Sequence, residues 1–248
     1  MIQQIYEAGY QSYFYTGTQI LSVLLAFGYT LFHCKKYKMK VLDAILALLI
    51  GIGFVYLWSM VEPWIESGFS TWGTKNTVRG IIVLPLVAWP TAKLLNVKYN
   101  KIMDLAGPVL CLVQGVGHIG CIFVGCCHGY ASDWGIYNPV YDEIQFPIQL
   151  VEAAVAVAVF VILVIIAVKM KYKTYGLLGP LSLVLFGLTR FACEFGRDNF
   201  KLFGNVSVLA LHCLSFVLVG LVWLIVYAIL YKKKYFQNKE LAEAAATK

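Results

Sequence analysis

The sequence predicts an all-α polytopic membrane protein, on the evidence of its apolar composition, its seven apolar windows and its uneven lysine distribution. Of the 248 residues, 60% are hydrophobic and 13% are charged. A soluble domain cannot bury that much apolar surface, whereas a bilayer accommodates it directly. We therefore expect one membrane domain over residues 1–248, with a cytoplasmic tail at 232–248 and no cleavable signal peptide.

Seven windows are long and apolar enough to cross a bilayer, which takes roughly 20 residues. They lie at about 16–34, 42–62, 79–97, 106–128, 147–168, 175–195 and 205–231. Pro85, Pro90 and the pair Gly107–Pro108 interrupt the third and fourth windows. Lipid tolerates such irregular backbone only where protein or a cavity surrounds it. Because polar residues also fall in the outer half of the fourth to sixth windows, we expect a polar-lined cavity open to the outside.

Lysine distribution predicts the orientation. Of twenty basic residues, fifteen fall in one set of loops and in the tail, including KKYKMK at 35–40 and KKK at 232–234. Such loops face the cytoplasm, so we expect the N-terminus outside and the C-terminus in the cytoplasm. The net charge of +7 then reflects topology and attraction to anionic inner-leaflet lipid, and we expect no nucleic-acid partner.

All three arginines, Arg79, Arg190 and Arg197, belong to the opposite, outer set, with Lys75 and Lys201. Arginine binds phosphate or carboxylate with two parallel donors and keeps its charge when partly desolvated. An arginine near a helix end can also snorkel or pair with a neighbouring carboxylate. Because an arginine within a spanning segment is costly, it is a functional candidate by default.

Two outer connections, at about 61–80 and 129–147, are rich in aromatic residues. In the first, Trp64, Phe69 and Trp72 have the spacing of an interfacial helix. We expect the two connections to form a small extracytoplasmic lid. An ordinary aromatic belt at the membrane surface is the alternative.

The stretch GHIGCIFVGCCHG at 117–129 combines three cysteines and two histidines with four glycines. Its C-x4-C-C-H spacing differs from that of most zinc sites, and adjacent Cys126 and Cys127 cannot readily both face one ion. We therefore expect no metal. A disulfide between Cys121 and Cys126 would need a break in the helix and an oxidising compartment. Unreactive buried thiols are the other interpretation.

Three motifs resemble, in order and spacing, those of the prolipoprotein diacylglyceryl transferase family. That family carries G-R-I-G-N-F running into N-G-E-x-x-G, then P-S-Q-L-Y-E, then Y-G-x-x-R-F-x-x-E-F-x-R. The matching positions here are Gly117, Ile119, Gly120, Gly125 and Gly129, then Pro147, Gln149, Leu150 and Glu152, then Gly187, Arg190, Phe191, Glu194, Phe195 and Arg197. The resemblance covers roughly residues 75–230 and implies a seven-helix fold with its N-terminus outside.

The resemblance also implies an activity. Members of that family are multi-pass proteins of the bacterial cytoplasmic (inner) membrane that transfer the diacylglyceryl group of phosphatidylglycerol to a lipobox cysteine, releasing glycerol phosphate. Arg190 and Arg197, beside Glu194, would hold the lipid phosphate and stabilise the leaving phosphate. Gln149 and Glu152 would order the site. We expect no cofactor.

The first motif departs from the family pattern. The signature arginine is His118 here, the signature asparagine is Cys121, and the glutamate is Cys126. The family's H-G-G-L element corresponds to VRGI at 78–81, so Arg79 and His118 stand in each other's place. We therefore expect Arg79 to join Arg190 as a catalytic phosphate clamp and His118 to act as general base. A core histidine bonded to the backbone is the alternative for His118.

His128 is a second candidate base, whereas His33 and His212 are predicted to be structural or interfacial. The rest of the stretch is predicted to form the wall of a lipid site. The wall residues are Gly117, Gly120, Cys121, Gly125, Cys126 and His128.

These observations predict a membrane transferase that acts on an anionic glycerophospholipid, phosphatidylglycerol, at the outer face of the membrane, with a prolipoprotein or another extracytoplasmic acceptor. A paralogous phosphoglycerol or acyl transferase is one alternative. A non-catalytic lipid-binding or transport protein is another, and a redox or metal protein built on the three cysteines is a third.

Overall fold

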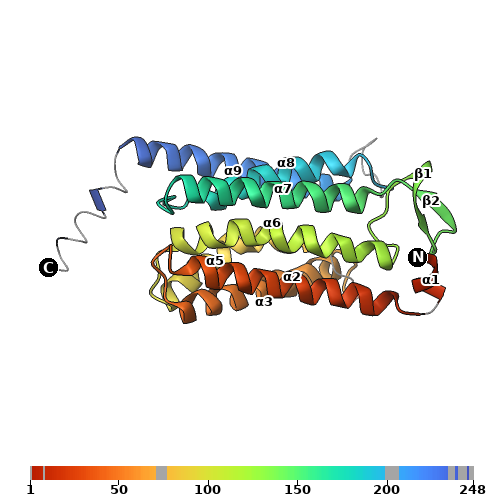
Figure 1. Ribbon diagram of the computed structural model, residues 1–248. Helices are drawn as coiled ribbons and strands as arrows, with labels where there is room; N and C mark the ends of the chain where they lie inside the picture. Colours follow the sequence, from red (N-terminus) through yellow and green to blue (C-terminus); the bar gives the residue numbers. More distant parts are fainter. Residues whose placement is uncertain are drawn as a thin grey trace.

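A computed structural model describes residues 2–7, 9–70, 77–198, 207–233, 238–239 and 245. Its elements are α1 (Ile2–Glu7), α2 (Gln11–Cys34), α3 (Val41–Glu66), α4 (Thr77–Gly80), the 3-10 helix η1 (Ile81–Val83), α5 (Leu84–Leu94), α6 (Tyr99–Phe123), β1 (Ala131–Asn138), β2 (Glu143–Gln145), α7 (Ile148–Lys169), α8 (Leu178–Glu194) and α9 (Val208–Lys232) (Figure 1). Trp72 and Lys75, assigned to the lid and to the outer charges, lie outside the described residues, as do Lys201 and most of the tail.

Within the described residues, five helices are long and apolar enough to cross a membrane: α2, α3, α6, α7 and α9. The other two predicted windows hold shorter elements. Helix α8 has 17 residues, and α4, η1 and α5 follow one another as a broken helix. Pro85 stands in the first turn of α5, where its missing amide hydrogen leaves no hydrogen bond unmade. The chain is therefore a mostly helical, multi-pass membrane protein.

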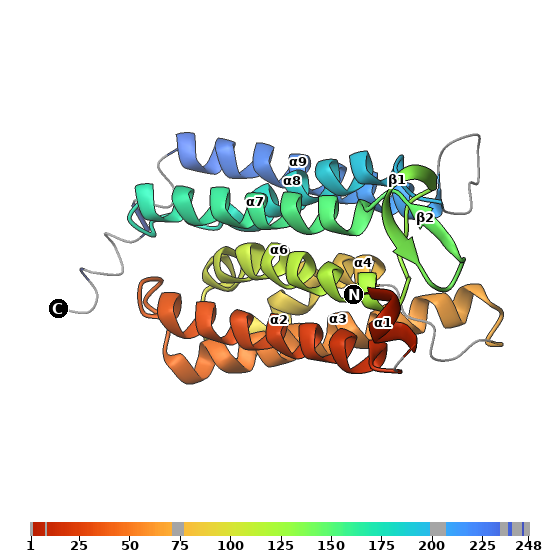
Figure 2. The ribbon, with the colours of Figure 1, turned by 45° about the vertical axis from the view of Figure 1, so that its right-hand side comes forward.

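The long helices lie side by side in an elongated bundle, with α6 between α2 on one side and α7 and α8 on the other (Figures 1 and 2). In the apolar part of α6, 67% of the residues are buried, against 33% or less in the other four candidate spans. Small residues allow this close packing. A Cβ at Gly107 of α6 would lie 2.7 Å from the carbonyl oxygen of Leu178 on α8. Polar side chains on α6 are therefore enclosed by protein.

A β-hairpin covers one end of the bundle, beside the N-terminus (Figure 1); we call this the hairpin end. Strands β1 and β2 are antiparallel, with Asn138 opposite Glu143 and an irregularity in the register of β1. The buried Asn138 side chain donates to the Gly125 carbonyl at 3.0 Å and to Gln145 Oε1 at 2.7 Å. These bonds fasten the hairpin to the turn that follows α6. The part of the predicted lid at 129–147 thus contains two short strands in an otherwise helical protein.

The other predicted lid segment, at 61–80, is divided in the structure. Its first residues belong to α3, which continues through Pro63 to Glu66. Its last residues form α4, which packs against α3. The described part of this segment therefore extends the bundle.

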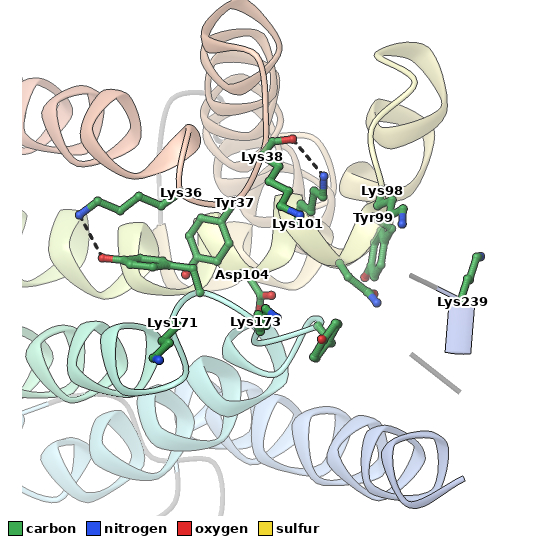
Figure 3. Close-up of a pocket in the computed structure, with 13 residues that line it drawn as sticks. Lys36, Tyr37, Lys38, Lys98, Tyr99, Lys101, Asp104, Lys171, Lys173 and Lys239 are labelled. Carbon is green, nitrogen blue, oxygen red and sulfur yellow. Dashed lines mark hydrogen bonds between the residues drawn. The ribbon is translucent and has the colours of Figure 1, made fainter. Parts of the chain in front are cut away.

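At the opposite end, the loops after α2, before α6 and after α7 surround a cavity of about 420 Å³ (Figure 3). We call this the lysine end. The lysines that line the cavity come from these loops, from the first turn of α6 and from the tail: Lys36, Lys38, Lys98, Lys101, Lys171, Lys173 and Lys239.

Asp104 of α6 joins the lysine end of α6 to the start of α8. Its side chain is 2% exposed and accepts hydrogen bonds from Thr174 Oγ1 at 2.5 Å, from the Gly176 amide at 2.7 Å and from the Leu178 amide at 2.9 Å. A carboxylate at a helix N-terminus satisfies amides that have no partner within the helix and interacts favourably with the helix dipole. Asp104 is thus a structural residue that no sequence motif indicated.

Replacing Asp104 should therefore destabilise the bundle. We expect Asp104→Ala to lower the free energy of unfolding by about 3 kcal/mol, because it leaves buried donors without an acceptor. Thr174→Val, which removes one of the three donors, should cost less. Unfolding in mixed micelles measures both changes, and equal stability of wild type and Asp104→Ala would contradict this role.

Candidate active site

Five ionisable side chains meet inside the bundle toward the hairpin end. A spacing of four residues places Arg190 and Glu194 on one face of α8, while His118 projects from α6 and Glu152 from α7. Arg197 follows the end of α8. We call His118, Glu152, Arg190, Glu194 and Arg197 the buried cluster; none is more than 6% exposed.

Glu152 is the centre of the buried cluster. Its Oε1 accepts from Arg197 Nε at 2.8 Å and lies 3.0 Å from Arg190 Nη1. Its Oε2 accepts from Arg197 Nη2 and lies 3.2 Å from His118 Nε2. One carboxylate on α7 therefore contacts charged or polar donors from α6, from α8 and from the segment after α8.

Glu194 supplies the second negative charge. It accepts from Arg190 Nη1 at 2.5 Å and from Ser207 Oγ at 2.8 Å, and Arg197 Nε lies 3.9 Å from the same carboxylate. Two guanidinium groups thus balance two carboxylates. This balance matters because an unpaired charge is very costly in a medium of low dielectric. Arg190 Nε remains buried without a hydrogen-bond partner among the described residues.

Two cavities adjoin at Gln114. The cavity beside the buried cluster has a volume of only about 10 Å³, which is room for about one water molecule. A second cavity of about 280 Å³ lies between α2, α3 and α6 and is lined mainly by aliphatic side chains. Gln114 lines both cavities and is hydrogen-bonded to His118 at 2.8 Å. Gln114 therefore stands between an apolar space and the charges.

The turn after α6, residues 124–128, lies against the buried cluster; we call it the cysteine turn. All seven cysteines are free, so the disulfide interpretation does not describe this structure. A ring nitrogen of His118 and the Sγ atoms of Cys121 and Cys127 lie within 4.8 Å of one another. Cys127 has a φ of 58°, a left-handed conformation that non-glycine residues seldom adopt. These three side chains could together hold a metal ion, although the sequence spacing argued against a metal site.

Several predicted site residues lie outside the buried cluster. Gln149 Nε2 donates to the Cys126 carbonyl at 3.0 Å, so it orders the cysteine turn. Gly117 and Gly120 pack against α2 rather than lining the buried cluster. His128 lies at the hairpin, with Nδ1 3.1 Å from the Gly129 carbonyl oxygen and its ring beside that of Tyr141.

Arg79 lies in a second charged group on α3, α4 and α9. Its guanidinium pairs with Glu66 and lies 4.0 Å from Glu62. His212 Nε2 lies 2.7 Å from the same Glu62 carboxylate. Among the described residues, Arg79 has no ion pair with the buried cluster. No sequence motif indicated that His212 belongs to this group, because the residues of α9 form no polar pattern around this histidine.

The contacts of His118 distinguish between the two interpretations of this residue. Its Nε2 is bonded to Gln114 and lies beside Glu152, while its Nδ1 has no partner among the described residues. The structure therefore does not show a core histidine satisfied by the backbone. It shows an imidazole held by side chains, with one ring nitrogen available.

A bundle of apolar helices that encloses paired arginines, glutamates and a histidine defines a multi-pass membrane protein with an internal polar site. The sequence comparison is more specific. The chain belongs to the prolipoprotein diacylglyceryl transferase family, whose sequence model matches residues 5–226. It is a membrane transferase of the diacylglyceryl transferase kind.

The names of two relatives agree with this family assignment. The chain is 26% identical to phosphatidylglycerol–prolipoprotein diacylglyceryl transferase 2 of Clostridium perfringens (strain 13 / Type A) over 200 residues, which are 75% of this chain and 76% of the relative. It is 27% identical to the phosphatidylglycerol–prolipoprotein diacylglyceryl transferase of Dehalococcoides mccartyi (strain CBDB1) over 99 residues, 38% of each chain.

The pairing in the buried cluster predicts a non-additive effect on stability. We expect Glu152→Leu to lower the free energy of unfolding by about 3–5 kcal/mol, because it leaves buried arginines unpaired. The double variant Glu152→Leu with Arg197→Leu should be less destabilised than Glu152→Leu alone. Unfolding in mixed micelles tests this, and strictly additive losses would show that the two side chains do not depend on each other.

Proposed function

We propose that this protein transfers the diacylglyceryl group of phosphatidylglycerol to a prolipoprotein thiol at the outer face of the bacterial cytoplasmic membrane. The buried cluster carries the proposal, because it places two arginines at one point within an apolar bundle. The relatives' names supply the two substrates. We propose that this chain acts on the same two substrates.

The proposed orientation places the lysine end in the cytoplasm and the hairpin end outside. Lysines gather in the loops at the first end, whereas all three arginines lie toward the second, as expected for cytoplasmic and outer loops. Helix α8 and the broken helix α4–η1–α5 would complete seven spans. The cluster then lies in the outer half of the membrane, within reach of an extracytoplasmic protein.

Arg190 and Arg197 would bind the phosphodiester of the lipid. In the structure they are held by Glu152 and Glu194, so an entering phosphate must share or replace these carboxylates. Arg190 Nε, which has no partner among the described residues, offers a donor that needs no such exchange. Charge-assisted bonds to a phosphate are strong in a site that excludes water. Arg79 is not assigned to this step, because its ion pairs are with Glu62 and Glu66.

The aliphatic cavity between α2, α3 and α6 would receive acyl chain atoms of the lipid. It has a volume of about 280 Å³ and reaches Gln114, next to the buried cluster. A lipid needs a polar site beside an apolar one. The small volume at the cluster itself, about 10 Å³, implies that helices or the hairpin move apart when substrate enters.

The reaction forms one bond and breaks another. The acceptor sulfur forms a thioether bond to the terminal glycerol carbon of the diacylglyceryl group, and the bond between that carbon and the phosphate oxygen breaks. Glycerol phosphate leaves with the electron pair, so its charge increases where the arginines lie. The acceptor thiol must lose its proton, and His118 is the residue of this site that promotes that loss.

An assay in vesicles tests the proposal directly. Purified protein in phosphatidylglycerol vesicles, with a headgroup-labelled lipid and a lipobox peptide, should release labelled glycerol phosphate and yield a heavier peptide. Label release without peptide modification would contradict the prolipoprotein acceptor and favour a different one. An untouched label would contradict the phosphatidylglycerol donor.

In the same assay, we expect Arg190→Ala and Arg197→Ala each to lower turnover by about 2 kcal/mol or more, roughly 30-fold, through loss of a charge-assisted contact. Arg79→Ala removes an arginine whose ion pairs lie elsewhere, so it should lose less. Wild-type turnover in both Arg190→Ala and Arg197→Ala would exclude the phosphate-binding role.

A further inference from the structure

His118, Cys121 and Cys127 have the geometry of an incomplete metal site. Their ligand atoms lie within 4.8 Å of one another. Zinc binds sulfur at about 2.3 Å and imidazole nitrogen at about 2.0 Å, so small side-chain movements would bring all three onto one ion. Cys127 has a left-handed backbone (φ 58°), and its Sγ belongs to this group whereas that of Cys126 does not. The expectation that adjacent cysteines exclude a metal therefore does not apply to Cys121 and Cys127.

His118 has the partners that a metal-binding histidine needs. Its Nε2 lies 3.2 Å from Glu152 Oε2 and 2.8 Å from the Gln114 side-chain amide. Ligating histidines commonly donate their second ring N–H to a carboxylate, and with the proton on Nε2 the Gln114 amide must present its oxygen to the ring. Its Nδ1 is buried and has no hydrogen-bond partner among the described residues. Leaving a buried polar atom unpaired costs free energy, and a bound ion would remove that cost.

We infer that His118, Cys121 and Cys127 bind one divalent ion of the zinc class and leave its fourth position for the thiol of the acceptor. Three protein ligands with one open position are the pattern of catalytic zinc. Thiolate and imidazole ligands select this class of ion over magnesium or calcium. The inference rests on the proposed function and specifies how the acceptor thiol is activated.

The chemistry balances without a change of oxidation state. Coordination of the acceptor thiol releases its proton to water, because a thiol bound to such an ion is deprotonated. The bound sulfur then attacks the glycerol carbon, the bond from that carbon to the phosphate oxygen breaks, and the thioether leaves the ion. Two protein thiolates and one substrate thiolate exceed the ion's charge by one. Arg197 pairs with the same Glu152 carboxylate that lies beside His118, so it supplies a positive charge next to the proposed ligands.

Cys126 provides a matched control. It directly precedes Cys127 in the chain, but it is outside the group of three ligand atoms. If Cys126 were a fourth ligand, the site would be closed, as in structural zinc sites. The inference therefore requires Cys127→Ser to lose the ion and Cys126→Ser to keep it.

The experiment is metal binding by the purified full-length protein. After treatment with chelator and reductant, Zn²⁺ alone should bind at one ion per chain, and Co²⁺ alone should give a thiolate-to-cobalt charge-transfer band. Cys121→Ser and Cys127→Ser should abolish the band, and Cys126→Ser should retain it. Glu152→Gln should weaken zinc binding roughly 10- to 100-fold, as expected for loss of a carboxylate behind a ligating histidine. Elution as a single species checks that each variant is folded.

The outcomes separate this inference from the proposed function. No binding, or equal loss in Cys126→Ser and Cys127→Ser, would overturn the open metal site. Equal lipid turnover with and without zinc would also overturn it, while leaving the transferase proposal intact. Zinc binding without any turnover would contradict the transferase proposal and not the metal site.

An independent feature lies at the lysine end. The cavity of about 420 Å³ there is lined by lysines from segments that are far apart in sequence, including Lys239 of the tail, with Asp104 among them (Figure 3). Lys36 Nζ donates to Tyr172 Oη at 3.2 Å, and Lys101 Nζ donates to the Lys38 carbonyl at 3.0 Å. Lysines that only set topology need not enclose a cavity.

We propose that this cavity binds a phosphate-bearing anion, either a phospholipid headgroup or a soluble phosphate. Lysines gathered from distant segments of the chain repel one another, and a bound anion offsets that repulsion. Basic pockets between spanning helices bind anionic headgroups in this way. Asp104 is the one carboxylate among the described residues that line the cavity, and a single negative charge is fewer than the positive charges of the lysines around it.

Thermal unfolding in nanodiscs tests this site. In neutral phosphatidylcholine discs we add pyrophosphate, and in a second arm the discs contain phosphatidic acid. We expect a rise in Tm in at least one arm, which identifies the source of the phosphate. Lys101→Gln with Lys171→Gln should abolish the rise. Lys40→Gln with Lys169→Gln, two lysines at the same end that do not line the cavity, should keep it. No rise in either arm, or equal loss in the two double variants, would overturn the proposal.

Discussion

The pairing of Glu152 with Arg190 and Arg197 is the interaction on which the interior of this protein depends. In a medium that does not solvate charge, each group is tolerable only because the others are present. Glu152 comes from α7, Arg190 from α8, and His118 from α6, so the pairing also fixes how these three helices meet. Glycines that allow backbones to approach closely, such as Gly107 and Gly115 of α6, make that meeting possible.

The same pairing bears on the function that we propose. A phosphate entering the buried cluster would meet arginines already paired with Glu152 and Glu194, so its binding would exchange one anion for another. On that proposal, the pairs stabilise the interior of the bundle, and substrate entry requires the bundle to open. The hairpin is tied by Asn138 to the cysteine turn, and Gln149 holds that turn from α7. Movement of the hairpin would therefore displace Cys126 and Cys127.

Some of the site could be predicted from sequence, because helical periodicity is local. The four-residue spacing of Arg190 and Glu194 put both on one face of a helix, and the family motifs added Glu152 and Arg197. Three features were not accessible in this way. The ion pairs of Arg79 with Glu62 and Glu66 join helices whose packing cannot be read from the spacing of residues in the sequence. The role of Asp104 depends on the residue at which α8 begins. The placement of the Cys127 side chain depends on the left-handed φ angle of that residue.

The sequence by itself determined that the chain is an apolar multi-pass protein of one family, with its arginines toward one end and its lysines toward the other. Composition and charge distribution suffice for the multi-pass character, because the membrane acts on every residue according to its polarity, and the ordered motifs indicate the family. Tertiary structure decided which polar groups became partners. The partners follow from the packing of α6 between α2, α7 and α8. Contacts between segments that are distant in sequence bring His118 next to Glu152, and the turn after α6 brings Cys127 next to His118 and Cys121. The spacing of residues within any one segment does not specify these contacts.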